Sequence, residues 1–230
     1  MLGQGLFVSW NRFVSAIPCD GGVAPYLVKQ GFEGSPYDHC ETWILSGAGS
    51  AGTDPNYVVS PLAGLKSLQV ISNTINQDAN CPAFSAIDEA WSYFLFRVDV
   101  MPVVFAKQVA VWQFGAGTSH GALSVNTNGT LQVASSSISA TVDALSVGVV
   151  YNVWFHFKSG TGANGVIDVG FSTTGIRPVA GDKFVQLTGQ TNPQDITHFS
   201  FMRYDGNPGN GDYVFDNARI DDAVIGDNPP

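Results

Sequence analysis

Charge is the scarcest property of this 230-residue sequence. Only 13% of the residues are charged, and only 10 of them are Lys or Arg, whereas roughly 25% of an average globular domain is charged. The net charge of −9 repels a phosphate backbone, and the basic residues form no cluster that would offset this repulsion. Nucleic acid is therefore not an expected partner.

Long apolar runs and sequence repeats are also missing. No run of 18 apolar residues occurs, so the sequence predicts neither a transmembrane helix nor a membrane partner. The N-terminal stretch MLGQGLFVSWNRFVSAIPCDGG lacks the basic start and apolar middle of a secretion signal, and we expect none. No internal repeat of fixed period occurs, which argues against propellers and solenoids.

Cysteine is rare as well. Cys19, Cys40 and Cys81 cannot all pair within one chain, and their spacing contains no C-x-x-C zinc pattern. Buried free thiols are the favoured interpretation. A Cys40–Cys81 disulfide stays open as the alternative in an oxidising compartment.

Strand signals, in contrast, are abundant. Hydrophobic residues make up 44% of the chain, and 26 Gly and 12 Pro are spread along it. In VYNVWFHFKSG, alternation predicts that Val153, Phe155 and Phe157 share a buried face. In GALSVNTNGTLQVAS, Asn128 and Gly129 predict a hairpin with a type I′ turn. Turn signals every 8 to 12 residues indicate an all-β, antiparallel two-sheet sandwich, most consistent with a jelly roll, over residues 30–230.

The first 29 residues do not share this pattern. They mix apolar residues such as Phe7, Trp10 and Phe13 with Gly and Pro, and they show no helical period. We therefore expect an extended N-terminal arm that docks on a neighbouring surface, and with it a homo-oligomer.

An ordered set of segments resembles a known superfamily. GFEGSPYD, AWSYFLFRVDVMP, GALSVNTNGTLQV, LSVGVVYNVWFHF and DYVFDNARIDDAVIG are similar to the concanavalin A-like, laminin-G-like jelly rolls. The resemblance covers residues 31–228 and implies the fold. It does not imply one activity, because lectins, glycosidases, lyases and capsid proteins share this fold.

The same resemblance implies a metal site. In calcium-binding members an early Glu and a late Asp hold one structural Ca²⁺ together with backbone carbonyls, which are oxygen ligands suited to a hard cation. Glu33 and Asp216 match these positions, and Asp38 is a third candidate. The alternative is that Glu33 accepts hydrogen bonds from backbone N–H groups of the turn at Gly34 and Ser35, without a metal.

Catalytic patterns are absent. Glycosidases of this fold carry acidic residues at alternate positions of one strand, in the form E-x-D-x-E, and no such strand occurs here. A lyase set can be assembled from His156, Arg203 and Tyr204, but no spacing requires it. No G-x-S-x-G, P-loop or H-E-x-x-H motif occurs. The sequence therefore predicts a protein that is not an enzyme.

A carbohydrate site is the remaining candidate. Sugars stack on exposed aromatic rings while a few polar groups bind their hydroxyls. Trp112 precedes a Gly-rich stretch that ends at His120, and Arg203 and Tyr204 precede the turn-rich DGNPGNGD. These four residues form the predicted carbohydrate-binding site.

Two functions from different classes follow from these observations. The favoured one is a structural protein of a bacteriophage particle, a capsid decoration or fibre component on the virion surface. Its arm would dock on the capsid or on sister subunits, and its lectin-like jelly roll would bind glycans. The alternative is an extracellular carbohydrate-binding module of a secreted polysaccharide-degrading system, and a polysaccharide lyase or glucanase ranks third.

Overall fold

The computed structural model describes only part of the chain. The described residues are 28–30, 44–47, 56–58, 62–63, 67–72, 77–81, 83–114, 118–135, 138–192, 194–202 and 211–227. They form strands, turns and loops, and none belongs to a helix that could cross a membrane.

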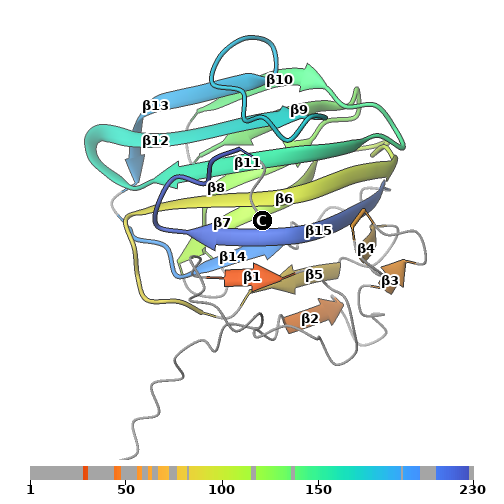
Figure 1. Cartoon of the computed structure of the whole chain (residues 1–230). Helices are drawn as coiled ribbons and strands as arrows, with labels where there is room; N and C mark the ends of the chain where they lie inside the picture. The colour runs from red at the N-terminus through yellow and green to blue at the C-terminus, as the bar shows by residue number, and fades with distance from the viewer. Residues whose placement is uncertain are drawn as a thin grey trace, which may run out of the picture.

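Fifteen described strands form two antiparallel sheets that pack face to face (Figure 1). Sheet A has the order β13-β12-β11-β6-β15-β4-β3, and β1 also pairs with β15: β1 Val28–Gln30, β3 Asn56–Val58, β4 Ser67–Ser72, β6 Glu89–Val100, β11 Val150–Lys158, β12 Gly160–Ser172, β13 Phe184–Asn192 and β15 Gly211–Asp221. Sheet B has the order β10-β9-β8-β7-β14-β5-β2: β2 Ile44–Gly47, β5 Gln77–Asn80, β7 Lys107–Phe114, β8 Thr118–Val125, β9 Thr130–Ala134, β10 Ser139–Ala144 and β14 His198–Phe201. This architecture confirms the predicted all-β two-sheet sandwich.

The core lies between the sheets and is rich in aromatic rings. Val153, Phe155 and Phe157 are fully buried in it, as the alternation in β11 predicts. From sheet B, Trp112 and Phe199 pack edge to face with their ring centroids 4.7 Å apart. Rings in such a core contribute both buried area and specific geometry.

The hairpin between β8 and β9 forms where it was predicted, but its turn type was predicted wrongly. Gly129 has a φ of 85°, whereas Asn128 is not among the residues with positive φ. The Gly129 N–H donates to the Asn126 carbonyl at 2.9 Å. In this turn only the fourth residue, Gly129, has a positive φ. A type I′ turn requires positive φ angles at both central residues.

The two sheets approach each other closely at Gly121 in β8. A Cβ atom at this position would lie 2.8 Å from Cδ1 of Ile167 in β12 and 3.0 Å from the Phe157 ring. A side chain at this position would therefore force the Ile167 and Phe157 side chains to shift.

The predicted N-terminal arm lies almost entirely outside the described residues. Only Val28 and Lys29 are described, and there they belong to β1, where Val28 pairs with Ile220 and Lys29 with Arg219. The arm's docking surface stays a prediction. Cys81 is a buried cysteine in no disulfide, and its Sγ accepts a hydrogen bond from the Phe199 N–H at 3.1 Å, whereas Cys19 and Cys40 lie outside the described residues.

Candidate functional site

The outer face of sheet B carries a row of uncharged hydrogen-bonding side chains. In β7 and β14, Trp112 and Phe199 point into the core, so by alternation Gln113 and Ser200 point outward. Gln113 Nε2 donates to Ser200 Oγ at 3.0 Å, and Ser200 Oγ donates to Oδ1 of Asn80 in β5. The row therefore crosses three neighbouring strands.

An imidazole extends this row. His198 of β14 is directly opposite Gln113 of β7, so their side chains lie on the same face. Its Nδ1 is 2.7 Å from the hydroxyl of Thr197, a contact that orients the ring. Burial lowers the pKa of His198 below its usual range. At neutral pH the ring is thus uncharged, and an uncharged imidazole can accept a proton.

Access to the row differs along its length. Gln113 is only 3% exposed and Ser200 is fully buried, whereas Asn80 and His198 are half-buried. Gln113 and Ser200, in the middle of the row, are therefore out of reach of a ligand, which would contact Asn80 or His198 first.

The outer face of sheet A carries charges instead of neutral polar groups. His156 of β11 lies between two carboxylates: its Nδ1 is 2.7 Å from Asp168 Oδ2 and its Nε2 is 3.1 Å from Glu89 Oε1. Lys158 Nζ donates to Glu89 Oε2 at 2.7 Å. The His156 ring also stacks on Trp91 with centroids 3.7 Å apart. Burial favours a raised pKa for Glu89, but Lys158 and His156 outweigh it and the pKa is lowered.

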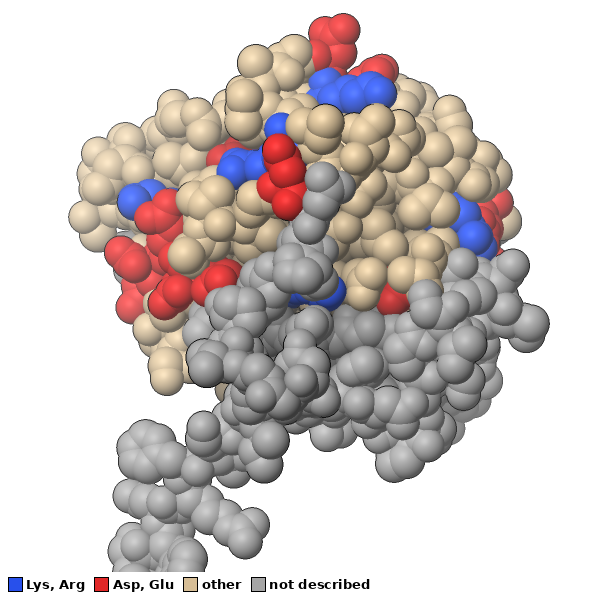
Figure 2. Space-filling model, viewed as in Figure 1, with Lys and Arg blue, Asp and Glu red and all other residues tan. Residues whose placement is uncertain are grey.

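The chain itself covers much of this face. The segment after β15 turns back over sheet A (Figure 1), where the Gly226 carbonyl accepts a hydrogen bond from Trp154 Nε1 and Ile225 belongs to a buried cluster with Trp91, Tyr93 and Trp154. Pro178, in the β12–β13 loop, lies against Gly170 so closely that a Cβ there would be 3.0 Å from it. Figure 2 shows Lys and Arg interspersed with Asp and Glu on this side. His156 is thus held in place and is not available as a base.

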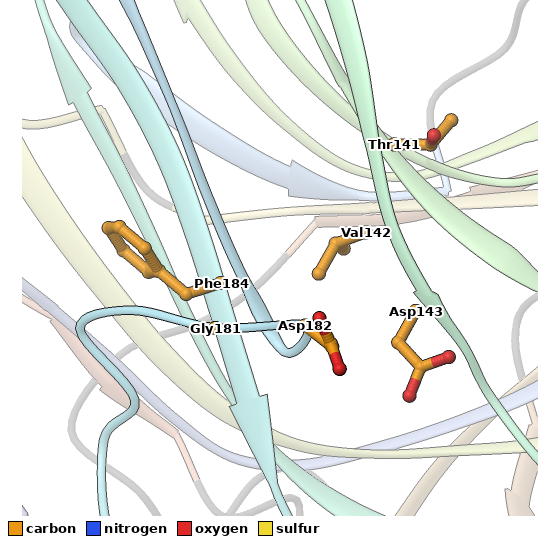
Figure 3. A pocket seen from close by; sticks show the side chains of 6 residues that line it. All are labelled: Thr141, Val142, Asp143, Gly181, Asp182 and Phe184. Carbon is orange, nitrogen blue, oxygen red and sulfur yellow. The ribbon is translucent and has the colours of Figure 1, made fainter.

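A surface pocket opens between β10 and the β12–β13 loop. It is lined by Thr141, Val142, Asp143, Gly181, Asp182 and Phe184. The Asp143 and Asp182 side chains lie close together, and Phe184 extends away from them (Figure 3). In the described part of the chain, no group of three His, Cys, Asp or Glu side chains is placed to hold a metal ion. Two exposed carboxylates alone do not make a metal site.

Of the four predicted carbohydrate-binding residues, the structure describes Trp112 and His120, and both are buried. Trp112 is fully buried between the sheets, and His120 is buried with its ring centroid 6.4 Å from that of Phe157. An indole in the core cannot stack on a sugar. Arg203 and Tyr204 lie outside the described residues.

The predicted calcium site is described at one residue. Asp216 is fully buried, and its Oδ2 accepts hydrogen bonds from Ser67 Oγ at 2.7 Å and from the Ala63 N–H at 3.0 Å. Protein donors therefore already occupy this oxygen. Glu33 and Asp38 lie outside the described residues, so a structural Ca²⁺ stays a prediction.

Sequence reasoning missed the polar row because it weighed the aromatic residues of these strands instead of their neighbours. Gln113 follows Trp112, and His198 and Ser200 flank Phe199. The available signal was alternation: once Trp112 and Phe199 are assigned to the core, the residues beside them must face outward.

Comparison with known proteins finds similar folds but no matching family. No protein-family profile matches the chain, and no curated protein matches it. Among solved structures, the cellulose-induced protein Cip1 aligns with a TM-score of 0.57 at 14% identity, covering 86% of this chain and 99% of that chain. A sialidase aligns with a TM-score of 0.54 at 13% identity, covering 79% of this chain but only 17% of its own length. The endo-β-1,4-glucuronan lyase of the fungus Trichoderma reesei aligns with a TM-score of 0.47 at 11% identity, covering 87% and 92%.

The alignments with Cip1 and the sialidase show that the chain shares a jelly-roll sandwich fold with these two proteins. They correct two expectations: the favoured function, a phage virion protein, and the prediction that the chain is not an enzyme, since proteins of this fold with similar structures include a sialidase. The missing E-x-D-x-E strand excluded one arrangement of carboxylates only. Catalytic groups of a sandwich can come from several strands, and a motif within one strand then does not reveal them.

Proposed function

We propose that the protein is carbohydrate-active and binds a polysaccharide on the outer face of sheet B. The observation that carries this proposal is the row of neutral donors and acceptors across β5, β14 and β7, in which Gln113 Nε2 donates to Ser200 Oγ at 3.0 Å and Ser200 Oγ donates to Asn80. Amides, hydroxyls and imidazoles hydrogen-bond sugar hydroxyls without the desolvation cost of a charged group.

The binding test uses affinity measurements with a panel of soluble neutral and acidic polysaccharides. His198→Ala and Asn80→Ala are expected to weaken binding about 3- to 10-fold each, the effect of one lost hydrogen bond. Lys158→Ala is the matched control, because Lys158 lies in sheet A. Equal affinities for wild type and both sheet B variants would contradict the proposal.

A lyase activity is the second candidate, and His198 is the observation that favours it. A polysaccharide lyase removes the proton from C5, the carbon next to the carboxylate of a uronic acid. The electron pair forms a double bond between C4 and C5, the bond from C4 to the glycosidic oxygen breaks, and the released oxygen takes a proton from water. An imidazole kept neutral by burial can accept that proton, and a substrate can reach His198 because the side chain is only half-buried.

The lyase candidate is tested by the ultraviolet absorbance of the unsaturated product that this elimination forms. Wild type should generate it from a polyuronate, and His198→Ala should abolish it while retaining measurable polyuronate binding. Product formation at an unchanged rate by His198→Ala would remove His198 as the base. Binding without product would leave the binding function alone.

A further inference from the structure

Arg177, in the β12–β13 loop on the outer face of sheet A, has a guanidinium whose buried Nε lacks a hydrogen-bond partner. Its Cζ lies 4.1 Å from the centroid of the Trp91 ring. Its Nη2 is 3.7 Å from Asp168 Oδ1, which is longer than a hydrogen bond. In the described part of the chain, this side chain is therefore an ion without a hydrogen-bonded partner.

Asp168 does not turn toward Arg177 because it is already engaged. Its Oδ2 faces Nδ1 of His156 at 2.7 Å and accepts a hydrogen bond from Gln186 Nε2 at 3.3 Å. These contacts fix the carboxylate on the side of β11 and β13. Asp168 therefore lies within ion-pair distance of Arg177 without forming a hydrogen bond to it.

Arg97, on the same face of sheet A, provides the contrast. Its Nε and Nη2 donate to the two carboxylate oxygens of Asp99 at 2.6 and 2.8 Å. The side chains of Arg97 and Arg177 are exposed to a similar extent, 17% and 14%. Incomplete pairing is thus a property of Arg177 and not of arginine at this depth.

Arg177 is also held in position. Its backbone N–H donates to Asp227 Oδ1 at 2.6 Å, and the next residue, Pro178, lies against Gly170. Burial lowers the pKa of Arg177, an effect that the charges of Asp168 and Asp227 oppose. A cation fixed in this way loses little conformational entropy when a ligand arrives, and a fixed donor set favours binding.

We propose that Arg177 anchors the carboxylate of a small monoanionic ligand, of the class of a uronic acid, on the outer face of sheet A. The planar guanidinium matches a planar carboxylate and donates two parallel hydrogen bonds to its oxygens. Asp168 and Asp227 lie beside Arg177, and their charges disfavour a dianion. The site is separate from the polysaccharide face on sheet B and does not depend on it.

The experiment titrates the full chain with glucuronate, acetate, sulfate and glucose by calorimetry. Glucuronate should bind, acetate should bind more weakly, and glucose and sulfate should not bind. Arg177→Gln should weaken glucuronate binding at least 10-fold, and Arg177→Lys should weaken it partially because the charge remains without the fork. Arg97→Gln is the control of matched burial and should leave the affinity unchanged.

Three results would overturn the proposal: no glucuronate binding by wild type, equal affinity of Arg177→Gln and wild type, or sulfate binding as tightly as glucuronate. If Arg177→Gln does not fold, Arg177→Lys decides, since equal affinity there contradicts a role for the fork. The polysaccharide affinity of His198→Ala is a separate readout, so failure here and failure of the sheet B proposal are distinguishable.

Discussion

Asp216 shows how a single buried carboxylate connects the last strand to a much earlier part of the chain. It accepts hydrogen bonds from Ser67 Oγ and the Ala63 N–H, and its other oxygen accepts from the Asn217 N–H at 2.7 Å. We expect Asp216→Ala to lower the free energy of unfolding by about 2–3 kcal/mol, because buried donors lose their acceptor.

Denaturant unfolding measures this loss. Asp143→Ala is the control, because Asp143 is exposed and surface substitutions usually stay within about 0.5 kcal/mol. A loss for Asp216→Ala no larger than that of the control would contradict the structural role. A melting temperature that falls when a chelator is added would in addition support the predicted structural Ca²⁺ site.

His198 predicts a pH dependence of stability. Because burial lowers its pKa in the folded state, the unfolded chain takes up a proton more readily, from about pH 6.5 downward. The contribution of the neutral ring is therefore fully present above that pH and is lost as the pH falls through the lower, folded-state pKa.

Melting temperatures between about pH 7 and 5 test this. His198→Gln should decline less steeply than wild type over this window. Parallel curves for the two proteins would show that the environment of His198 does not disfavour its protonated form.

At the scale of elements, Gly121 reports on the fit between β8 and β12. A Cβ here would lie 2.8 Å from Ile167 Cδ1, so Gly121→Ala should destabilise the protein by about 1–3 kcal/mol through overpacking. Gly226→Ala is the matched control, because a Cβ at Gly226 meets no atom within 4 Å. Thermal or denaturant unfolding of both variants gives the comparison, and equal stabilities would contradict the close approach.

The strands were predictable from the sequence because alternation is a local property. Val153, Phe155 and Phe157 are buried as expected, and the hairpin at Gly129 lies at the expected position. The site was not predictable, since its members come from β5, β7 and β14. Asn80, Gln113 and Ser200 lie side by side only because of the order of the strands in sheet B. Local sequence patterns do not reveal that order. For the same reason Trp112 was placed on the surface: alternation defines two faces but does not say which of them is buried.

At the scale of the whole molecule, one continuous core joins the two sheets. Phe94 from sheet A packs against Phe199 and Phe201 from sheet B, with ring centroids 6.2 and 5.0 Å apart. We therefore expect the sheets to unfold together. Tryptophan fluorescence and far-ultraviolet circular dichroism should give coincident transitions. Two separated transitions would mean that one sheet is stable alone.

The position of β15 has a consequence for biosynthesis. It follows the other described strands in the sequence, but it lies inside sheet A, pairing with β6 on one side and with β4 and β1 on the other. While residues 211–221 are still in the ribosomal exit tunnel, β6 and β4 have no strand between them, and sheet A stays in two parts. The nascent chain must therefore keep its aromatic strands soluble until β15 has emerged, a period in which exposed strand edges favour aggregation and chaperone binding. A premature stop codon just before residue 211 would remove the strand that joins the early and middle parts of the sheet.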